Sequence, residues 1–182
     1  MTSTATGISV WNLDPVNSEV EFSVKHMMVS TVKGRFLDVA ARIEIDEAEP
    51  ANSKVEAEIA TASVDTGFDQ RDNHLRSDDF FNAERFPKLT FRSTKIEPAA
   101  EDRWFVTGDL TIRDVSRPVV LDLTYEGRIV DAYGKDRAAF SAHTSISRRD
   151  FGVNWNGAIE AGGVVVGDTV KINLEIAAVR EE

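Results

Sequence analysis

The sequence predicts an all-β protein: an eight-stranded antiparallel barrel with a short helical segment around residues 66–87. Two observations predict this fold. Apolar and polar residues alternate strictly in many segments, as in Glu19–His26, where Val20, Phe22 and Val24 share one face of a strand. About eight such segments occur, and closing an antiparallel sheet of that length into a barrel removes its unpaired edges. The inward faces of the strands then become the first place to look for a function.

The first two predicted strands form a hairpin. One runs from about residue 16 to 28 and the other from about 31 to 45, joined by a short turn at Val29 and Ser30. The second strand is long, and its alternation is interrupted over Leu37-Asp38-Val39. An extra residue in a strand is typical of a β-bulge, so we expect a bulge there that turns Val39 and the alternate residues after it inward.

A third strand is predicted over residues 54–64, where Val55, Ala57 and Ile59 alternate with polar residues. The alternation then stops, and charged and aromatic residues mix over about 65–87, which favours helical turns. Ser77 or Asp78 could cap a short helix in this segment. Its apolar side chains can pack as a lid over one mouth of the barrel; they are Phe68, Leu75, Phe80, Phe81 and Phe86.

Five further strands complete the predicted barrel. They cover residues 88–95, 103–113, 118–129, 137–146 and 168–179, and residues 114–117 are expected to connect the second of these to the third. A loop of about 20 residues, from 147 to 167, precedes the last strand, and loops of that length are often functional. Small inward residues could leave a channel along the barrel axis; they are Ala57, Gly108, Ala138 and Ala142.

Composition and charge limit the possible partners. The 182 residues suit a single domain spanning 1–182. The chain carries 31 Asp and Glu against 21 Lys and Arg, a net charge of −10 that disfavours nucleic acid as a partner. There is no cysteine, and no apolar run reaches transmembrane length, so we expect no integral membrane protein. The first ten residues lack the features of a signal peptide, which predicts a cytoplasmic location.

Few side chains suggest catalysis. The histidines His26, His74 and His143 are far apart in the sequence and lack the spacing of a metal-binding helix, so we predict no metal site. His26 has inward parity and could be a core residue or a polar group at the barrel mouth. Arg71, Asp72 and His74 could in principle do acid–base chemistry, but an Arg-Asp pair that locks an irregular segment is the favoured interpretation. Arg148, Arg149 and Asp150 are interpreted in the same way, with anion binding as the alternative.

An ordered set of motifs extends over nearly the whole chain. It begins with Trp11-Asn12-Leu13-Asp14-Pro15 and continues through His26–Phe36, Arg71–Phe81 with Phe86-Pro87, Gly108–Ile112, Arg149–Gly152 and Val166–Asp168. This set resembles the YceI-like family of polyisoprenoid-binding proteins. One departure concerns the turn after Ile112, where many relatives have a glycine and this chain has Arg113-Asp114.

This resemblance implies a lipocalin-like barrel whose apolar pore holds a long-chain isoprenoid-type lipid, such as a polyprenyl compound or a prenylated quinone. It implies no catalytic residue and no cofactor other than that ligand, and it suggests a homodimer. The residues expected to line the pore or its ends are Phe22, Val24, His26, Phe36, Ile59, Phe80, Phe81, Leu110, Ile112, Leu121, Phe140 and Ile172.

Two alternatives remain open from the sequence. The first is an enzyme that modifies a lipid or isoprenoid with His26, Arg71, Asp72 or His74. The second is a stress-related interaction module whose barrel is filled by its own side chains. Two of the four polar groups in hydrogen-bond contact beside a ligand would favour the enzyme, and an interior without gaps would favour the interaction module.

Overall fold

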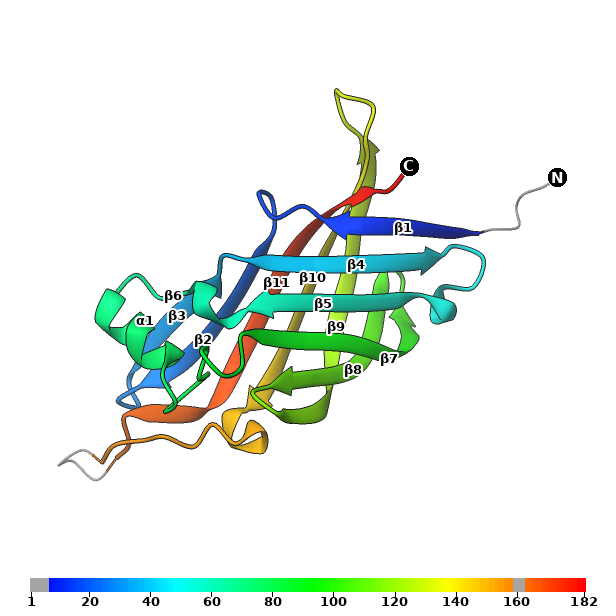
Figure 1. Ribbon diagram of the computed structural model, residues 1–182. Coiled ribbons are helices and arrows are strands. Elements are labelled where there is room, and N and C mark those ends of the chain that lie inside the picture. Colours follow the sequence, from blue (N-terminus) through cyan, green and yellow to red (C-terminus); the bar gives the residue numbers. More distant parts are fainter. Residues whose placement is uncertain (1–6, 159–162) are drawn as a thin grey trace.

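The structure, a computed structural model, describes residues 7–158 and 163–182. Within these residues it contains one continuous antiparallel sheet, one α-helix and three 3-10 turns (Figure 1). The strands are β1 (Ile8–Leu13), β2 (Glu19–His26), β3 (Ser30–Phe36), β4 (Val39–Asp46), β5 (Lys54–Ala60), β6 (Val64–Asp65), β7 (Lys88–Ala100), β8 (Arg103–Ile112), β9 (Val115–Val130), β10 (Asp136–Ser147) and β11 (Val166–Arg180). The helices are α1 (Asp69–Arg76) and the 3-10 turns η2 (Pro50–Asn52), η3 (Thr61–Ser63) and η4 (Arg148–Phe151).

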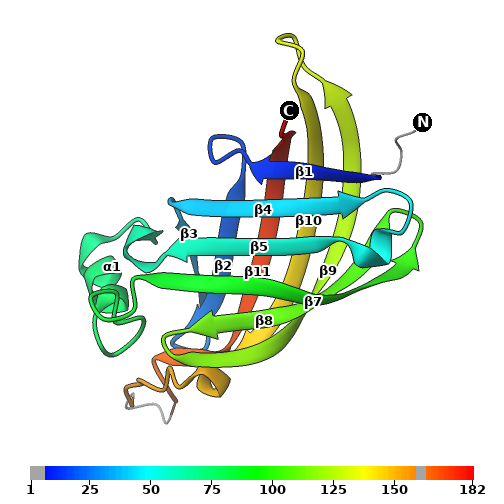
Figure 2. The ribbon, with the colours of Figure 1, turned by 45° about the vertical axis from the view of Figure 1, so that its right-hand side comes forward.

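Eight of the strands close into a barrel, which confirms the predicted fold class. The ring runs β1-β4-β5-β7-β8-β9-β10-β11, and pairing of Trp11 with Arg180 and of Leu13 with Ala178 closes it. The first part of β11 pairs instead with β2, from which β3 and β6 extend the sheet. Figure 2 shows α1 at one end of the barrel and the chain's C-terminus at the other.

Several strands differ from the prediction. The first predicted strand, over residues 16–28, is observed as β2, which extends the sheet outside the ring of eight, and the predicted strand over 54–64 is divided into β5, η3 and β6. The segment predicted as one strand over residues 31–45 is broken at Leu37-Asp38, so the expected bulge is a break between β3 and β4. Before the break the chain pairs with β2, and after it the chain pairs with β1 and β5. The strand β1 was not predicted. Both of its faces carry apolar residues, and Ser9 points inward because its hydroxyl accepts a hydrogen bond from Trp11 Nε1 at 2.8 Å.

The turn between β8 and β9 is shorter than expected. Residues 115–117 belong to β9, which leaves Arg113 and Asp114 as the turn. Arg113 adopts φ 56°, the left-handed conformation that glycine favours, so the turn keeps a glycine-like geometry with an arginine. Its guanidinium donates to the backbone oxygens of Asp78 and Phe80 at 2.7 and 3.1 Å, which fastens this turn to the segment after α1.

The helical segment is confirmed, and Ser77 does cap the helix, but at its C-terminus and not at its N-terminus. The helix α1 begins at Asp69, and Ser77 and Asp78 follow its end. The Ser77 hydroxyl donates to the carbonyl of His74 at 2.6 Å, so it stabilises the C-terminus of the helix. Among the described residues, no helix is long and apolar enough to cross a membrane.

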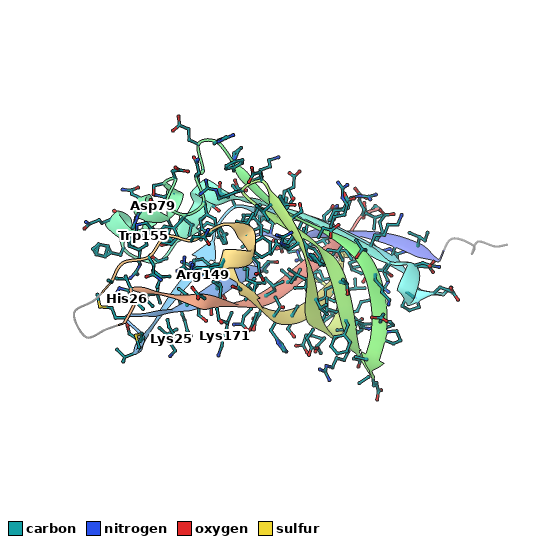
Figure 3. The ribbon with its side chains drawn as sticks, turned by 90° about the horizontal axis from the view of Figure 1, so that it is seen from below. Lys25, His26, Asp79, Arg149, Trp155 and Lys171 are labelled. Atoms are coloured by element: carbon teal, nitrogen blue, oxygen red, sulfur yellow. The ribbon has the colours of Figure 1, made fainter. Side chains whose placement is uncertain are left out.

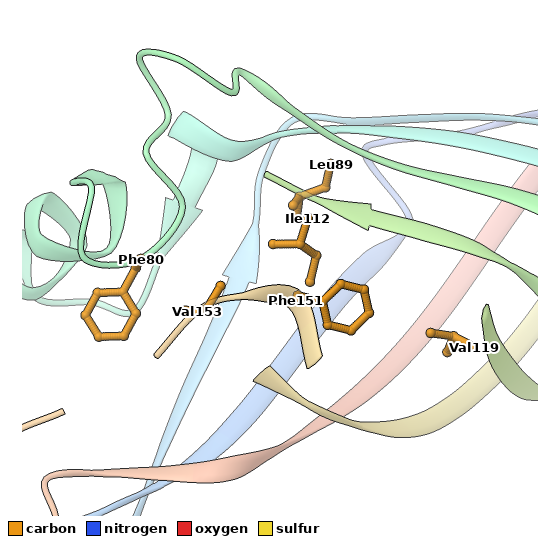
Figure 4. Close-up of a cluster of buried hydrophobic side chains, with 6 residues drawn as sticks. All are labelled: Phe80, Leu89, Ile112, Val119, Phe151 and Val153. Carbon is orange, nitrogen blue, oxygen red and sulfur yellow. The ribbon is translucent and has the colours of Figure 1, made fainter. Parts of the chain in front are cut away.

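Two hydrophobic clusters lie at opposite ends of the barrel. The larger one joins the strands to the segment after α1 and to the loop after β10 (Figure 4); its buried members are Phe80, Leu89, Ile112, Val119, Phe151 and Val153. The smaller one consists of Trp11, Ala138 and Ala178 with partly buried neighbours such as Phe140. The interior between these clusters is where a cavity remains.

Candidate functional site

An apolar cavity of about 650 Å³ lies inside the barrel. Its wall is formed mainly by Val, Ile, Leu and Phe side chains from β2 to β5 and from β7 to β11. This volume is within the range of about 300–1,000 Å³ that is typical of ligand sites. An eight-stranded barrel can be filled by side chains or can enclose one small ligand, and the free volume here places this barrel in the second class.

All twelve residues that the sequence placed at the pore line this cavity. From the strands come Phe22, Val24, His26, Phe36, Ile59, Leu110, Ile112, Leu121, Phe140 and Ile172, and from the segment after α1 come Phe80 and Phe81. Period-two parity located the strand residues, because alternate side chains of a barrel strand point inward. Their contact with a ligand remains a prediction.

Other wall residues were missed by the sequence reasoning. Leu13 was overlooked because β1 lacks a clean alternation, and Val153, Trp155 and Val165 lie in a loop without any periodicity. A signal existed only for Trp155, since a large aromatic residue in a long polar loop usually packs onto something. Thr144 is also on the wall, at inward parity in β10.

Two of the four small residues leave space in the cavity, and two do not. Ala57 and Ala142 are on the wall. Gly108 instead gives room to the ring of Phe91, which would lie 2.4 Å from a β-carbon added at this glycine. Ala138 is buried in the cluster around Trp11. Of these four small residues, Ala57 and Ala142 are therefore the ones that leave free volume in the interior.

One end of the cavity is closed. Trp11 is 1% exposed and packs with Ala138 and Ala178, and the guanidinium of Arg128 lies 5.2 Å from its ring centre. The side chain of Arg128 also donates to Glu47 and Asp136. Burial and these hydrogen bonds together seal this end of the barrel.

The other end is a mouth formed by α1, the end of β2 and the loop before β11. Aromatic rings surround it: Phe36 lies 5.6 Å from Phe22 and 5.7 Å from Phe81, and the ring of Trp155 lies 4.7 Å from that of His74 and 5.4 Å from that of Phe80. Figure 3 shows His26, Asp79 and Trp155 at this end of the molecule. Aromatic rings at a mouth offer apolar contact to a ligand that enters there.

The loop at the mouth is held by Arg148, which is 5% exposed. Its guanidinium donates to the carbonyl oxygens of Val153, Trp155 and Gly167 at 2.8 Å each, and to that of Val166 at 3.3 Å. Burial lowers the pKa of this guanidinium from its ordinary value, and Asp168 opposes that shift. Because its donors are used by the loop, Arg148 has a structural role, as the sequence analysis favoured.

The helix α1 is fixed to the barrel through Thr66. Asp72 is 4% exposed and accepts hydrogen bonds from the Thr66 amide and hydroxyl, at 2.8 and 2.5 Å. Arg71 donates to the hydroxyl and the carbonyl oxygen of the same residue at 2.7 and 2.9 Å. The expected locking role is therefore present, but each side chain bonds to Thr66 and not to its neighbour.

The polar groups proposed for acid–base chemistry lie in α1 and at the end of β2. His26 and His74 both line the cavity, His74 also bonds to Asp79 at 2.9 Å, and His143 is exposed on the outer face. Over residues 7–158 and 163–182, no hydrogen bond joins any two of the proposed acid–base residues His26, Arg71, Asp72 and His74. In the same part of the chain, no three His, Asp or Glu side chains are close enough to hold a metal ion.

A closed antiparallel barrel with an apolar cavity and one aromatic mouth defines the class of small β-barrels built to enclose an apolar ligand. Within that class, the chain belongs to the YceI-like family, whose YceI-like domain model matches residues 11–178. The resemblance noted in the sequence is thereby confirmed.

Individual relatives agree with this assignment. A UPF0312 protein of Staphylococcus epidermidis is 37% identical over 88% of this chain and 92% of its own length. A Campylobacter jejuni YceI protein of known crystal structure is 37% identical in sequence to this chain. The two structures match with a TM-score of 0.74 over 87% of this chain and 90% of that one. A polyisoprenoid binding domain from Saccharophagus degradans has a TM-score of 0.70 over 94% of this chain and 98% of its own, but at 17% identity it shows only that the fold is shared.

Proposed function

We propose that this protein is a non-enzymatic binder or carrier of one long-chain isoprenoid-type lipid, a polyprenyl compound or a prenylated quinone, held in the barrel cavity. The observation that carries the proposal is the cavity of about 650 Å³ with its almost wholly apolar wall. The name of the S. degradans domain agrees with this class of ligand. Binding of an apolar ligand requires no reactive group on the wall; it requires space and the exclusion of water.

The energy of burial is sufficient for such a role. Each buried methylene contributes about 0.8 kcal/mol, so a chain of a dozen carbons gains on the order of 10 kcal/mol before association costs. A rigid, preformed cavity reduces the association costs, because little of the wall has to be ordered when the ligand enters. Micromolar affinity or better is therefore within reach of apolar contact alone.

The polar groups of the wall favour a weakly polar head group such as a quinone. The buried guanidinium of Arg148 donates to four backbone oxygens and is not available to a phosphate, whereas Arg71 uses Nε and one Nη to hold Thr66. The Thr144 hydroxyl, the His26 ring and the Gln70 amide are among the groups on the wall that suit a carbonyl or hydroxyl of a head group.

The two alternatives are weaker on this geometry. A filled-barrel interaction module requires an interior without a large gap, whereas the cavity has the size of a ligand site. A lipid-modifying enzyme requires reactive groups in contact with one another, whereas Arg71 and Asp72 are both used to hold Thr66.

Filling the cavity tests the proposal. The double variant A57F/A142F places two rings on the wall, and we expect it to lose at least tenfold in affinity for a benzoquinone that carries two isoprene units, measured by titration calorimetry. The matched control is A40F/A139F, because Ala40 and Ala139 lie in the same sheet but are exposed on its outer face. Circular dichroism checks that both variants fold. Equal affinity in all three proteins would refute cavity binding.

A homodimer and a cytoplasmic location also remain proposals. The hairpin between β9 and β10 extends beyond the barrel and exposes Ile129, Val130 and Tyr133, at 68%, 62% and 90%. Such an apolar surface is suited to self-association. Light scattering of the wild type and of an I129D variant tests the dimer, which we expect only in the wild type, and cell fractionation tests the location.

A further inference from the structure

The tip of the hairpin between β2 and β3 is an exposed apolar surface beside the cavity mouth. Met27, Met28 and Val29 are 43%, 60% and 85% exposed. Val164 is 43% exposed, and its neighbour Val165 accepts a hydrogen bond from the Met27 amide at 2.8 Å, which brings the two segments together. We call these four residues the apolar rim. An apolar surface beside a cavity mouth is typical of a site of interaction.

The backbone of this tip is unusual for the residues it carries. Met27 and Met28 have φ values of 51° and 68°, both in the left-handed region. Hairpin turns with two consecutive residues of this kind favour Asn-Gly, because other side chains are strained there. Two methionines therefore occupy positions that disfavour them while exposing much of their surface. Strained conformations of this kind are concentrated at functional sites, and contact with an external partner would account for them.

Three lysines flank the apolar rim on the outer face of β11, β2 and β3. The strand registers place Lys171, Ser23 and Lys33 side by side, with Lys25 two residues closer to the tip. Figure 3 shows Lys25 and Lys171 on the same side of the barrel. All three lysines are exposed. Among the residues that the structure describes, neither they nor Lys54 lie within 4 Å of a carboxylate, whereas Lys88, Lys95 and Lys135 each have such a partner.

The local charge is opposite to that of the whole chain. The protein has a net charge of −10, whereas on this face three neighbouring lysines outnumber the carboxylate Glu21, which lies opposite Arg35, so the local surface is positive. The nearby Arg35 and Arg149 are neutralised by Asp65 and Asp168. Apolar side chains at a tip with lysines around them suit the surface of an anionic bilayer. The apolar groups can enter the boundary of the acyl chains, and the lipid phosphates attract the ammonium groups.

We propose that the apolar rim and the three lysines dock the cavity mouth onto the surface of an anionic phospholipid bilayer. His26 and Val165 line the cavity directly beside the rim, so docking in this orientation brings the mouth to the layer from which a lipid would enter. This inference rests on the proposed function for its purpose, but the docking itself can be measured with empty protein.

Flotation of the full-length chain with vesicles tests the charge. We expect binding to vesicles that contain 30% phosphatidylserine in phosphatidylcholine, little binding to phosphatidylcholine alone, and a loss of binding in high salt. The variant K33Q/K171Q should bind the anionic vesicles about 25-fold more weakly, since each lysine near the surface contributes roughly fivefold. The matched control K54Q/K95Q makes the same change in net charge at the opposite end of the barrel and should bind like the wild type. Equal binding to both vesicle types, or equal loss in both variants, would overturn the proposal.

A second variant tests the apolar rim. Replacing Met27 and Met28 by Asn and Gly (M27N/M28G) gives the turn the residues it favours, so its urea midpoint should stay the same or rise. Its affinity for the anionic vesicles should nevertheless fall by tenfold or more. A turn with a purely structural role would show no such fall, and that result would overturn the proposal.

Quinone uptake from detergent solution separates this inference from the proposed function. The variants K33Q/K171Q and M27N/M28G change no residue on the cavity wall, so both should take up the quinone like the wild type. Wild-type protein that docks on vesicles but takes up no quinone would refute the proposed ligand and support docking. Wild-type protein that takes up the quinone but ignores anionic vesicles would refute docking alone.

Discussion

The two ends of the barrel differ in how they are held. At the closed end, Trp11 and Ala178 are 1% and 0% exposed, and Arg137 joins two carboxylates, Asp14 at 2.8 Å and Asp131 at 2.6 Å. At the mouth, one buried arginine, Arg148, holds a loop by its backbone oxygens, and aromatic rings surround an opening. The closed end combines burial with ion pairs between strands, whereas the mouth depends on hydrogen bonds to a loop.

This difference separates stability from access. A barrel that holds a ligand needs one end that keeps water out and another that the ligand can enter. Elements that move for binding come from the less stable parts of a protein, because opening them requires fewer contacts to be broken. We therefore expect substitutions at the closed end to reduce the stability of the fold, and equivalent substitutions at the mouth to act more on ligand uptake.

The largest expected effect is that of Trp11→Ala. Removal of a fully buried tryptophan leaves a cavity, and we expect the free energy of unfolding to fall by about 3–5 kcal/mol in urea denaturation. The equivalent change at the mouth, Trp155→Ala, removes a partly buried ring and should cost about 1–2 kcal/mol while weakening quinone uptake. Equal losses of stability at the two ends would contradict the comparison.

Arg148→Met sharpens the account of the mouth. The variant keeps much of the side-chain volume but leaves the carbonyl oxygens of Val153, Trp155 and Gly167 without their donor, so we expect a loss of about 2–4 kcal/mol. Hydrogen exchange should increase in the loop before β11 more than at β1. The control is Arg149→Met. Its side chain is exposed and, among the described residues, its ion pair is with Asp168 alone, so the loss should stay below about 1 kcal/mol.

A smaller expected effect is that the ion pairs at the closed end make the stability of the fold depend on pH. The pKa of Asp131 is lowered chiefly by the hydrogen bond from Arg137, and that of Asp14 by hydrogen bonds from Asn17 and Arg137. A carboxylate with a lowered pKa in the folded state adds stability above its ordinary pKa, here 3.8, and this contribution is lost as the pH falls below that value.

The difference in urea midpoint between the wild type and Arg137→Gln should accordingly be largest near pH 7 and shrink as the pH falls from about 4 to 2.5. The effect is limited because these groups are close to solvent, which screens their interaction. A difference that is constant over this range would show that Arg137 stabilises the closed end through packing and not through its carboxylate partners.

Much of the barrel was predictable because alternation is a local property. A barrel strand with one dry face, such as Lys54–Ala60, shows its burial in its own residues. The strand β1 does not, since Ser9 faces inward with a hydrogen bond to Trp11 while Ile8 is exposed. The break at Leu37-Asp38 could not be predicted either. A break and a bulge look alike in the sequence, and only the pairing of β4 with β1 distinguishes them.

The cavity wall followed from the same parity, but its volume did not. Gly108 and Ala142 both occupy inward positions of their strands and are similar in size. Only the structure shows that the ring of Phe91 occupies the space beside Gly108. Similarly, the sequence suggested that Arg71 pairs with Asp72, whereas each of them bonds to Thr66. Contacts between distant or irregular segments depend on packing, which no local pattern records.

The measurement that tests the central claim most directly is native mass spectrometry of the purified protein, combined with mass spectrometry of its organic-solvent extract. The account predicts one prenyl-chain lipid or quinone per chain, lost in A57F/A142F and retained in A40F/A139F. A bare protein that also fails to take up added prenyl lipids would contradict it, and the apolar cavity would then have some purpose other than holding such a ligand.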